Sequence, residues 1–285
     1  MNIQKINTFL IAIIILAVLG IFGYRHFSRP KYVPLPPRPE INITIIPGWN
    51  LRQIATDWVK KGLIKNEDEL YALVGEPAKN YRAVKTVSPV LDWTATGTLA
   101  ELFTDKSSSV SYEGYFLPET YRVYADAKPE EIIKKIFSVL DDKIIPEMRT
   151  EAVAQKKTWF DILTMASVVE REAASAEDMK LVADIFWRRL QKNWALQSCA
   201  TVNYVTGKND PAVNAEDRQI DSFYNTYKYP GLPLGPIGNP SLKAINATLY
   251  PTKNDYWYFM SGTDGVMHYA KTLEEHNVNV AKYLR

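Results

Sequence analysis

The stretch TWFDILTMASVVEREAA, residues Thr158 to Ala174, predicts a buried helix that carries a carboxylate. Thr158 is a suitable N-cap, and Asp161 follows three residues later, with the spacing of a capping box. Apolar residues dominate from Trp159 to Val169 and cover almost the whole circumference of the helix. A helix of this kind belongs inside a hydrophobic core.

One acidic residue, Glu170, falls on the apolar side of this helix. At about 100° per residue it projects over the same face as Trp159, Leu163 and Ala166, whereas Glu172 points nearly the opposite way. Apolar surroundings disfavour the charged form of a carboxyl group and raise its pKa, which is the state that a general acid needs near neutral pH. The helix alone leaves a second interpretation open, in which this carboxylate ends the apolar run and pairs with a surface arginine.

The composition of the 285-residue chain is that of a globular protein with room for a membrane anchor and one or two domains. Its net charge of +2 gives no argument for nucleic-acid binding. The one cysteine, Cys199, excludes an intrachain disulfide. The three histidines, His26, His268 and His276, have no metal-ligand spacing, so we expect neither a metal nor another cofactor.

An uncharged run, Thr8 to Tyr24, predicts a single transmembrane helix at the short limit of length. A cleavable signal peptide is the rival interpretation, but residues 25–30 contain no small-x-small cleavage pattern. We therefore expect an uncleaved anchor, preceded by a cytoplasmic tail over residues 1–7. Most nearby basic residues follow the run, so the positive-inside rule alone would place the C-terminal part in the cytoplasm. A long folded domain weakens that rule, and the function inferred below requires the opposite orientation.

Beyond the anchor, the sequence predicts an α+β protein in two parts. Prolines make residues 25–40 a stiff linker. Residues 41–110 contain a strand over 41–46 and helices over 51–61 and 67–74, which indicates a small α+β module. Residues 111–285 form a larger mixed α+β domain around the Glu170 helix. Its other predicted elements are an extended or strand segment over 110–123, helices over 129–142, 144–155, 176–190, 241–249 and 273–284, and strands over 257–261 and 267–270.

A segment rich in proline and glycine, YPGLPLGPIGNP over residues 229–240, predicts a loop of fixed shape. Loops held by a rigid scaffold often carry function. The alternative is an ordinary ordered connection, and composition does not decide between the two.

Short motifs in a fixed order resemble the endolytic murein transglycosylases of the MltG/YceG type. Each motif is short, but six in register over roughly residues 111–285 are specific. They are Glu113-Gly114-Tyr115 with Pro118-Glu119-Thr120-Tyr121; Ala166 to Glu172; Leu196-Gln197-Ser198 with Thr201, Val202 and Tyr204; Tyr224 to Tyr227; Gly231-Leu232-Pro233 with Gly235 to Ile237 and Asn239-Pro240; and Glu275-His276-Asn277. Upstream, Ile43 to Gly48 with Ile54-Ala55 resemble the LysM-like module of this family.

The chain also departs from the family pattern. Typical members carry more sequence between the anchor and the catalytic domain, which leaves glycan binding by residues 41–110 in doubt. Cys199-Ala200 stands where Asp-Pro is expected, and Leu234 stands where proline is expected. These departures bear on the shape of the expected substrate-binding groove and leave the Glu170 motif intact.

The resemblance implies peptidoglycan glycan strands as the substrate and Glu170 as the catalytic residue. A lytic transglycosylase needs no activated water, because one carboxyl group can protonate the oxygen between MurNAc and GlcNAc and then take the proton of the C6 hydroxyl. The ring then closes to a 1,6-anhydro end. The resemblance also implies a cell-membrane-anchored enzyme whose C-terminal domain lies on the periplasmic or extracellular side, with peptidoglycan synthases as candidate partners.

Polar residues in the same motifs are candidates for substrate binding. They are Glu113, Gln197, Ser198, Thr201, Tyr204, Asn225, Tyr227 and Asn239. For Glu113 a structural role is equally open, and Tyr227 either stacks on a sugar or packs in the core.

Two other functions stay open. One is a non-catalytic scaffold that binds glycan and recruits synthases, with Glu170 a relic. The other is a cytoplasmic pyridoxal-dependent lyase, against which stand the anchor and the lack of a lysine in a recognisable cofactor setting. Replacing Glu170 with Gln separates the enzyme from the scaffold, because only the enzyme would lose its anhydro products.

Overall fold

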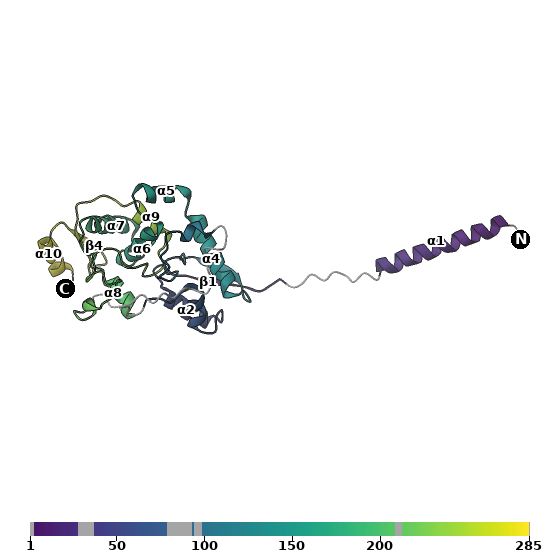
Figure 1. Ribbon diagram of the computed structural model, residues 1–285, viewed down its shortest axis with the longest axis horizontal. Coiled ribbons are helices and arrows are strands. Elements are labelled where there is room, and N and C mark those ends of the chain that lie inside the picture. The colour runs from purple at the N-terminus through teal and green to yellow at the C-terminus, as the bar shows by residue number, and fades with distance from the viewer. Residues whose placement is uncertain (1–2, 28–36, 79–92, 94–98, 209–212, 285) are drawn as a thin grey trace. The chain divides into compact units, whose positions relative to one another are not determined.

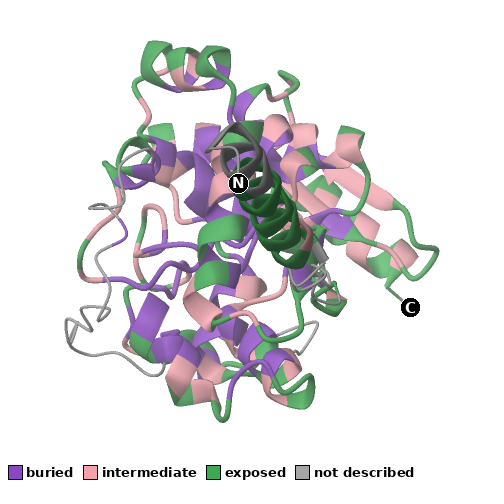
Figure 2. Ribbon diagram, turned by 90° about the vertical axis from the view of Figure 1, so that its right-hand side faces the viewer, coloured by how far each residue is buried: buried purple, intermediate pink, exposed green. Residues whose placement is uncertain are grey.

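The computed structural model describes residues 3–27, 37–78, 93, 99–208 and 213–284. It divides into two units, residues 1–38 and residues 39–285 (Figure 1). The first unit holds helix α1, Ile3–Phe27, whose apolar side chains from Leu10 to Phe22 are exposed (Figure 2). Within the described residues, no helix combines the length and the hydropathy needed to cross a membrane. The anchor predicted over residues 8–24 lies within α1 and stays a prediction. Most of the predicted linker lies outside the described residues.

The second unit begins with a strand that pairs far along the chain. Strand β1, Glu40–Thr44, is antiparallel to β2, Thr120–Tyr124, with Ile43 opposite Tyr121. This pair confirms the first predicted strand and places part of the segment 110–123 in a sheet. The boundary predicted at residue 110 therefore falls inside one compact unit.

Two capped helices follow β1, as the sequence predicts. Helix α2, Leu51–Lys60, has Asn50 as its N-cap in a reciprocal capping box with Gln53. Helix α3 spans Glu67–Val74. The sequence also predicts loops over residues 86–89 and 94–98, which lie outside the described residues. A short 3-10 helix, η3, covers Glu101–Phe103. The order of strand and helices agrees with a small α+β module, whereas its LysM-like character stays a prediction.

The remaining elements surround helix α6. They are α4 (Pro129–Lys143), α5 (Pro146–Ala154), α6 (Trp159–Glu172), α7 (Ala176–Gln191), α8 (Cys199–Thr206), the 3-10 helix η4 (Asp217–Gln219), α9 (Leu242–Leu249), β3 (Tyr258–Ser261), β4 (Met267–Ala270) and α10 (Leu273–Tyr283). Strands β3 and β4 form an antiparallel hairpin that α10 covers. Helix α8 has no counterpart among the predicted elements.

Helix α6 is the buried helix that its sequence predicts. The Thr158 hydroxyl accepts from the Asp161 N–H (3.0 Å), and the Asp161 carboxylate accepts from the Thr158 N–H (2.9 Å), so the capping box is complete. Ile162, Leu163 and Val169 are fully buried. The helix packs against α7, α8 and α9, which together enclose it almost to its C-terminal end.

Candidate active site

Glu170 lies in the last turn of α6, where the helix leaves the core. The stripe that it shares with Trp159, Leu163 and Ala166 is buried, but Glu170 itself is half-exposed. Its Oε2 accepts hydrogen bonds from the backbone N–H (2.9 Å) and from the hydroxyl of Ser241. The prediction of purely apolar surroundings for this carboxylate is therefore wrong, because its nearest partners are polar donors.

Ser241 brings the start of α9 against this carboxylate. It is the N-cap residue of α9, and its hydroxyl oxygen also accepts from the Ala244 N–H (3.2 Å). A helix N-terminus carries unpaired N–H groups and a partial positive charge, so it stabilises a negative charge on Glu170. Ser241 follows the proline-rich loop, 71 residues after Glu170. The pattern of α6 alone could not reveal this contact.

Glu170 lines an open groove of about 640 Å³, which we call the Glu170 groove. The groove is bordered by the end of α6, the starts of α7 and α9, the turn after β1 and the β3–β4 hairpin. Six of its polar residues are Glu170, Arg171, Glu172, Ser241, Lys243 and Ser261. A surface of charged and hydroxyl groups can exchange hydrogen bonds with an extended polar ligand such as an oligosaccharide.

A second hollow, of about 680 Å³, adjoins this groove because Arg171 and Glu172 line both. We call it the Ser198 pocket. It contains three of the predicted substrate-binding residues, namely Gln197, Ser198 and Tyr227. The groove and the pocket thus form one path around the end of α6, and these three residues stay candidates for contact with a substrate.

Glu172 is a further candidate for a functional carboxylate, although helical spacing predicts that it points to the far side of α6 from Glu170. It is half-buried and accepts a hydrogen bond from the Ser198 hydroxyl. Burial raises the pKa of the Glu172 carboxyl, against the lowering effects of the Ser198 hydrogen bond and of the charges on Arg189 and Arg171. The path curves round the helix end, so residues that point in different directions both reach it. In the sequence, the position of Glu172 within the motif Ala166 to Glu172 is the one signal that could have indicated a role for it.

Six of the predicted substrate-binding residues are almost fully buried. The exposed fractions are 0% for Thr201 and Asn239, 1% for Glu113 and Asn225, and 3% for Ser198 and Tyr204. Their polar atoms bond within the protein, which favours positioning roles, and contact of these residues with a sugar stays a prediction. Tyr204 also borders a smaller hollow of about 230 Å³ next to Arg171.

Glu113 is the centre of a buried polar junction. Its oxygens accept from the Leu51 N–H (3.1 Å to each), from the Tyr204 hydroxyl (3.2 Å) and from the Asn239 side-chain amide (3.0 Å). Burial raises the pKa of Glu113 to about 7, although these donors and the charge of Arg52 act to lower it. We call Glu113 and these three hydrogen-bond partners the Glu113 junction. It joins the first turn of α2 to α8 and to the proline-rich loop.

Asn239 fixes the end of the proline-rich loop through every polar atom of its side chain. Its Oδ1 accepts from the N–H groups of Gly114 and Phe116 (2.9 Å each), and its Nδ2 donates to the Trp49 carbonyl (2.8 Å) as well as to Glu113. Its backbone oxygen accepts from the Gly48 N–H (2.9 Å). These bonds agree with the prediction of a loop of fixed shape.

Asn225 and Thr201 shape the segment that presents Tyr227, and the Thr201 hydroxyl lies 2.9 Å from that of Thr226. The Asn225 amide donates to the carbonyls of Arg218 (2.9 Å) and Ile220 (2.8 Å), and its oxygen accepts from the Tyr227 N–H (3.0 Å). The half-buried Tyr227 has its hydroxyl 3.1 Å from the Cys199 sulfur and the Arg218 guanidinium over its ring. The arginine therefore occupies one face of the ring, which restricts stacking on a sugar to the other face.

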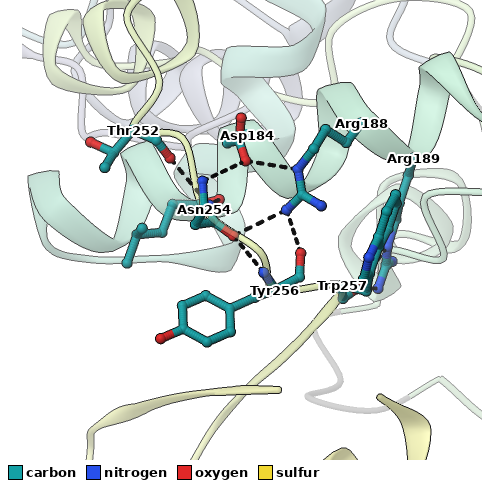
Figure 3. A network of polar contacts seen from close by, with 8 residues as sticks. Asp184, Arg188, Arg189, Thr252, Asn254, Tyr256 and Trp257 are labelled. Carbon is teal, nitrogen blue, oxygen red and sulfur yellow. Dashed lines mark hydrogen bonds and ion pairs between the residues drawn. The ribbon is translucent and has the colours of Figure 1, made fainter. Parts of the chain in front are cut away.

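A network on α7 holds residues 252–257, the segment that leads into strand β3 (Figure 3). Asp184 accepts from Arg188 (2.8 Å) and from the Asn254 N–H (3.2 Å), and Arg188 also donates to the Asn254 side chain (3.0 Å). Arg189 donates to the carbonyls of Trp257 (2.5 Å) and Leu196 (2.7 Å). These bonds fix residues 252–257, and therefore β3, against α7. Among the described residues, no group of three His, Cys, Asp or Glu side chains has a geometry suited to a metal ion.

The fold and the groove define an α+β protein in which two carboxylates and several hydroxyls face a path suited to an extended polar ligand. Residues 31–282 match the YceG-like family, and the chain belongs to this family. A solved structure of a yceG-like protein from Listeria monocytogenes is similar, with a TM-score of 0.65 and 33% sequence identity over 83% of this chain and 74% of that one.

Similar curated proteins include endolytic murein transglycosylases from two organisms. The Bacillus subtilis protein is 39% identical over 173 residues, which cover 60% of this chain and 48% of that protein. A Streptococcus pneumoniae protein is 37% identical over 195 residues, which cover 66% of this chain and 35% of that protein. The matched segment thus spans less than half the length of either relative.

Proposed function

We propose that this chain is a lytic transglycosylase that cuts peptidoglycan glycan strands endolytically at the MurNAc–GlcNAc bond and leaves 1,6-anhydro-MurNAc ends. The observation that carries the proposal is the Glu170 carboxylate, which faces an open polar groove in a chain of the YceG-like family. The names of the curated relatives support the same reaction class.

In its simplest form, the reaction gives both proton transfers to Glu170. The protonated carboxyl donates to the bridging oxygen as the bond from C1 of MurNAc to that oxygen breaks. The resulting carboxylate takes the proton of the C6 hydroxyl as O6 bonds to C1, which closes the anhydro ring and restores the protonated carboxyl. Ser241 donates two hydrogen bonds to this carboxylate and stabilises its charge between the two transfers.

The proposal extends to the location of the enzyme. Residues 8–24 of α1 anchor the chain in the cell membrane, and the second unit works on the periplasmic or extracellular side. Residues 25–40 space the enzyme from the bilayer, and the module that contains α2 and α3 is LysM-like. Such a tether would keep the groove close to newly made strands and to the synthases that make them.

A glycan-binding scaffold is the second candidate, and one contact favours it. Glu170 bonds the N-cap residue of α9, so it would stabilise the fold without any catalytic role. A scaffold of this kind would bind strands through the same groove but leave them uncut.

The test is digestion of purified sacculi by the full chain, followed by mass spectrometry of the muropeptides. We expect products lighter by one water than those of hydrolysis, and we expect Glu170→Gln to lower their formation by about 10²–10⁴-fold. Glu177→Gln is the matched control, because Glu177 is an exposed glutamate in the first turn of α7. If the wild type binds sacculi and releases no anhydro products, the scaffold is correct. If the Glu170→Gln variant still releases them, the catalytic role of Glu170 is excluded.

A further inference from the structure

The two carboxylates of the last turn of α6 face serines that engage them differently. Ser241 donates both its N–H and its hydroxyl to Glu170. Ser198 offers Glu172 only its hydroxyl, because the Ser198 N–H donates to the Thr226 hydroxyl (3.1 Å). An N–H group can only donate, whereas a hydroxyl can turn and accept. The Ser198 hydroxyl can therefore bond Glu172 whether that carboxyl is charged or protonated. The Ser241 N–H can only donate, so it favours a charged Glu170.

Helix dipoles add to this difference. Both glutamates lie at the C-terminal end of α6, where the unpaired carbonyls disfavour negative charge. For Glu170, the N–H of the α9 cap residue offsets this effect directly. Glu172 has no backbone N–H partner among the described hydrogen bonds, and burial is the largest influence on its carboxyl, whose pKa is raised.

The groups that face Glu172 come from every wall of the Ser198 pocket. They are Arg171 on α6, Arg189 on α7, Cys199 at the start of α8, Tyr227 in the segment between η4 and the proline-rich loop, Tyr258 on β3 and His276 on α10. The two arginines favour the charged form of Glu172, but the desolvation of its carboxyl outweighs them. The pocket thus holds a carboxyl that keeps its proton to a higher pH than an ordinary glutamate, at a place that a ligand can reach.

The positions of the two side chains suit a strand that crosses the end of α6. Side chains two residues apart on a helix do not share a face, yet Glu170 and Glu172 both line the path. A saccharide that occupies the groove at the helix end could therefore contact both carboxylates. Glycosidases commonly place a pair of carboxylates on either side of the bond that they cleave.

We propose that Glu172 is a second catalytic carboxylate, which donates the proton to the glycosidic oxygen while Glu170 takes the proton of the C6 hydroxyl. This inference rests on the proposed function and divides the two proton transfers of the simpler cycle. The bond from C1 to the bridging oxygen breaks and that oxygen gains the proton of Glu172. The bond from O6 to C1 forms and the O6 proton passes to Glu170. Water in the open groove then returns a proton from Glu170 to Glu172.

The first experiment compares Glu172→Gln and Glu170→Gln in the full chain on two substrates. One substrate is the peptidoglycan strand, and the other is a 2,4-dinitrophenyl glycoside of the GlcNAc–MurNAc disaccharide, whose phenolate leaves without a proton. We expect Glu172→Gln to lose about 10²–10⁴-fold on strands and only a few-fold on the aryl glycoside. Glu170→Gln should lose activity on both substrates, because the C6 hydroxyl still needs a base.

The second experiment follows the pH profile and keeps the test decisive if Glu172→Gln fails to fold. In the wild type, the rate should fall as the pH rises through the pKa of Glu172, above the usual glutamate range. Because the Ser198 hydrogen bond lowers that pKa, Ser198→Ala should move this limb to higher pH, whereas Ser222→Ala, at a buried serine that bonds the Tyr224 N–H, should not move it.

Three results would overturn the inference. The first is a Glu172→Gln variant that acts on strands within about threefold of the wild type, and the second is a pH limb that Ser198→Ala leaves in place. The third is a folded Glu172→Gln variant that loses activity on both substrates, since an acid that is not needed for the aryl glycoside cannot explain that loss. Each outcome differs from failure of the proposed function, in which the wild type itself forms no anhydro ends.

Discussion

The Glu113 junction and the Glu170 groove each hold a glutamate, and their surroundings are opposite. Glu113 is 1% exposed, and burial raises its pKa to about 7. Glu170 is half-exposed and contacts a serine at the start of a helix. Burial thus raises the pKa of a glutamate that a polysaccharide cannot reach. A perturbed carboxyl therefore indicates a functional site only when a ligand has access to it.

The two regions are connected through one turn. Asn239 belongs to the junction, and its backbone bonds the Gly48 N–H and the Trp49 carbonyl. Gly48 lies against the side chains of Arg171 and Glu170. The junction therefore sets the position of the turn, and the turn forms part of the border of the groove. If this connection matters, damage to the junction should affect both stability and activity.

The largest expected effect is at Asn239. Asn239→Ala would leave the N–H groups of Gly114 and Phe116 without a partner in a buried region and would remove one of the donors to Glu113. We expect the free energy of unfolding to fall by about 3–5 kcal/mol, measured by urea denaturation.

The control for this substitution is Asn246→Ala. Asn246 is half-buried, and its amide bonds only the Leu242 carbonyl within α9, so a change of about 0.5 kcal/mol or less is expected. A similar loss in both variants would show that the junction contributes no more than an ordinary surface amide.

A second expectation concerns Glu113 and pH. Its pKa is about 7 in the folded protein against 4.5 for an unperturbed glutamate. The folded state therefore holds this proton more tightly than the unfolded state, so the contribution is complete below pH 4.5 and is lost as the pH rises to about 7. Relative to the wild type, Glu113→Gln should gain about 3 kcal/mol of stability across this interval.

The measurement is urea denaturation of both proteins at several pH values. Glu177→Gln, at an exposed position, should keep a constant difference from the wild type over the same range. A constant difference for Glu113→Gln as well would mean that the junction does not hold a proton, and the contrast between the two regions would lose its electrostatic basis.

The local features of the fold could be predicted from the sequence. The spacing of residues three and four apart along the chain predicts the capping box at Thr158 and Asp161, the buried stripe of α6 and the extent of α7. All three are confirmed. The sequence does not predict helix α8, because its small polar and aromatic residues, from Cys199 to Thr206, show no apolar periodicity. The pairing of β1 with β2 joins segments that are far apart in the chain, and no local pattern specifies it.

The candidate site was only partly predictable for the same reason. The motif places Glu170 in the last turn of the predicted helix, but the partner of Glu170 lies 71 residues away at Ser241. Short polar residues such as Asn239 and Thr201 bond sugars and backbone groups equally well, so residue type alone cannot separate a ligand contact from a buried framework contact. The burial of each side chain bears on this choice, and burial depends on the whole fold.

The smallest expected effect tests the connection between the two regions. Gly48 and Gly62 have similar backbone conformations, with φ of +77° and +70°, so an alanine at either position is strained by about 1–2 kcal/mol. An added Cβ at Gly48 would lie 3.2 Å from Cδ of Arg171 and 3.7 Å from Cγ of Glu170, whereas one at Gly62 would meet no atom within 4 Å. Gly48→Ala should therefore lower the release of anhydro muropeptides by about tenfold, because small displacements at a catalytic group reduce the rate steeply. Gly62→Ala should lose the same stability and keep its activity, and equal activities in the two variants would show that the turn after β1 takes no part in positioning the groove.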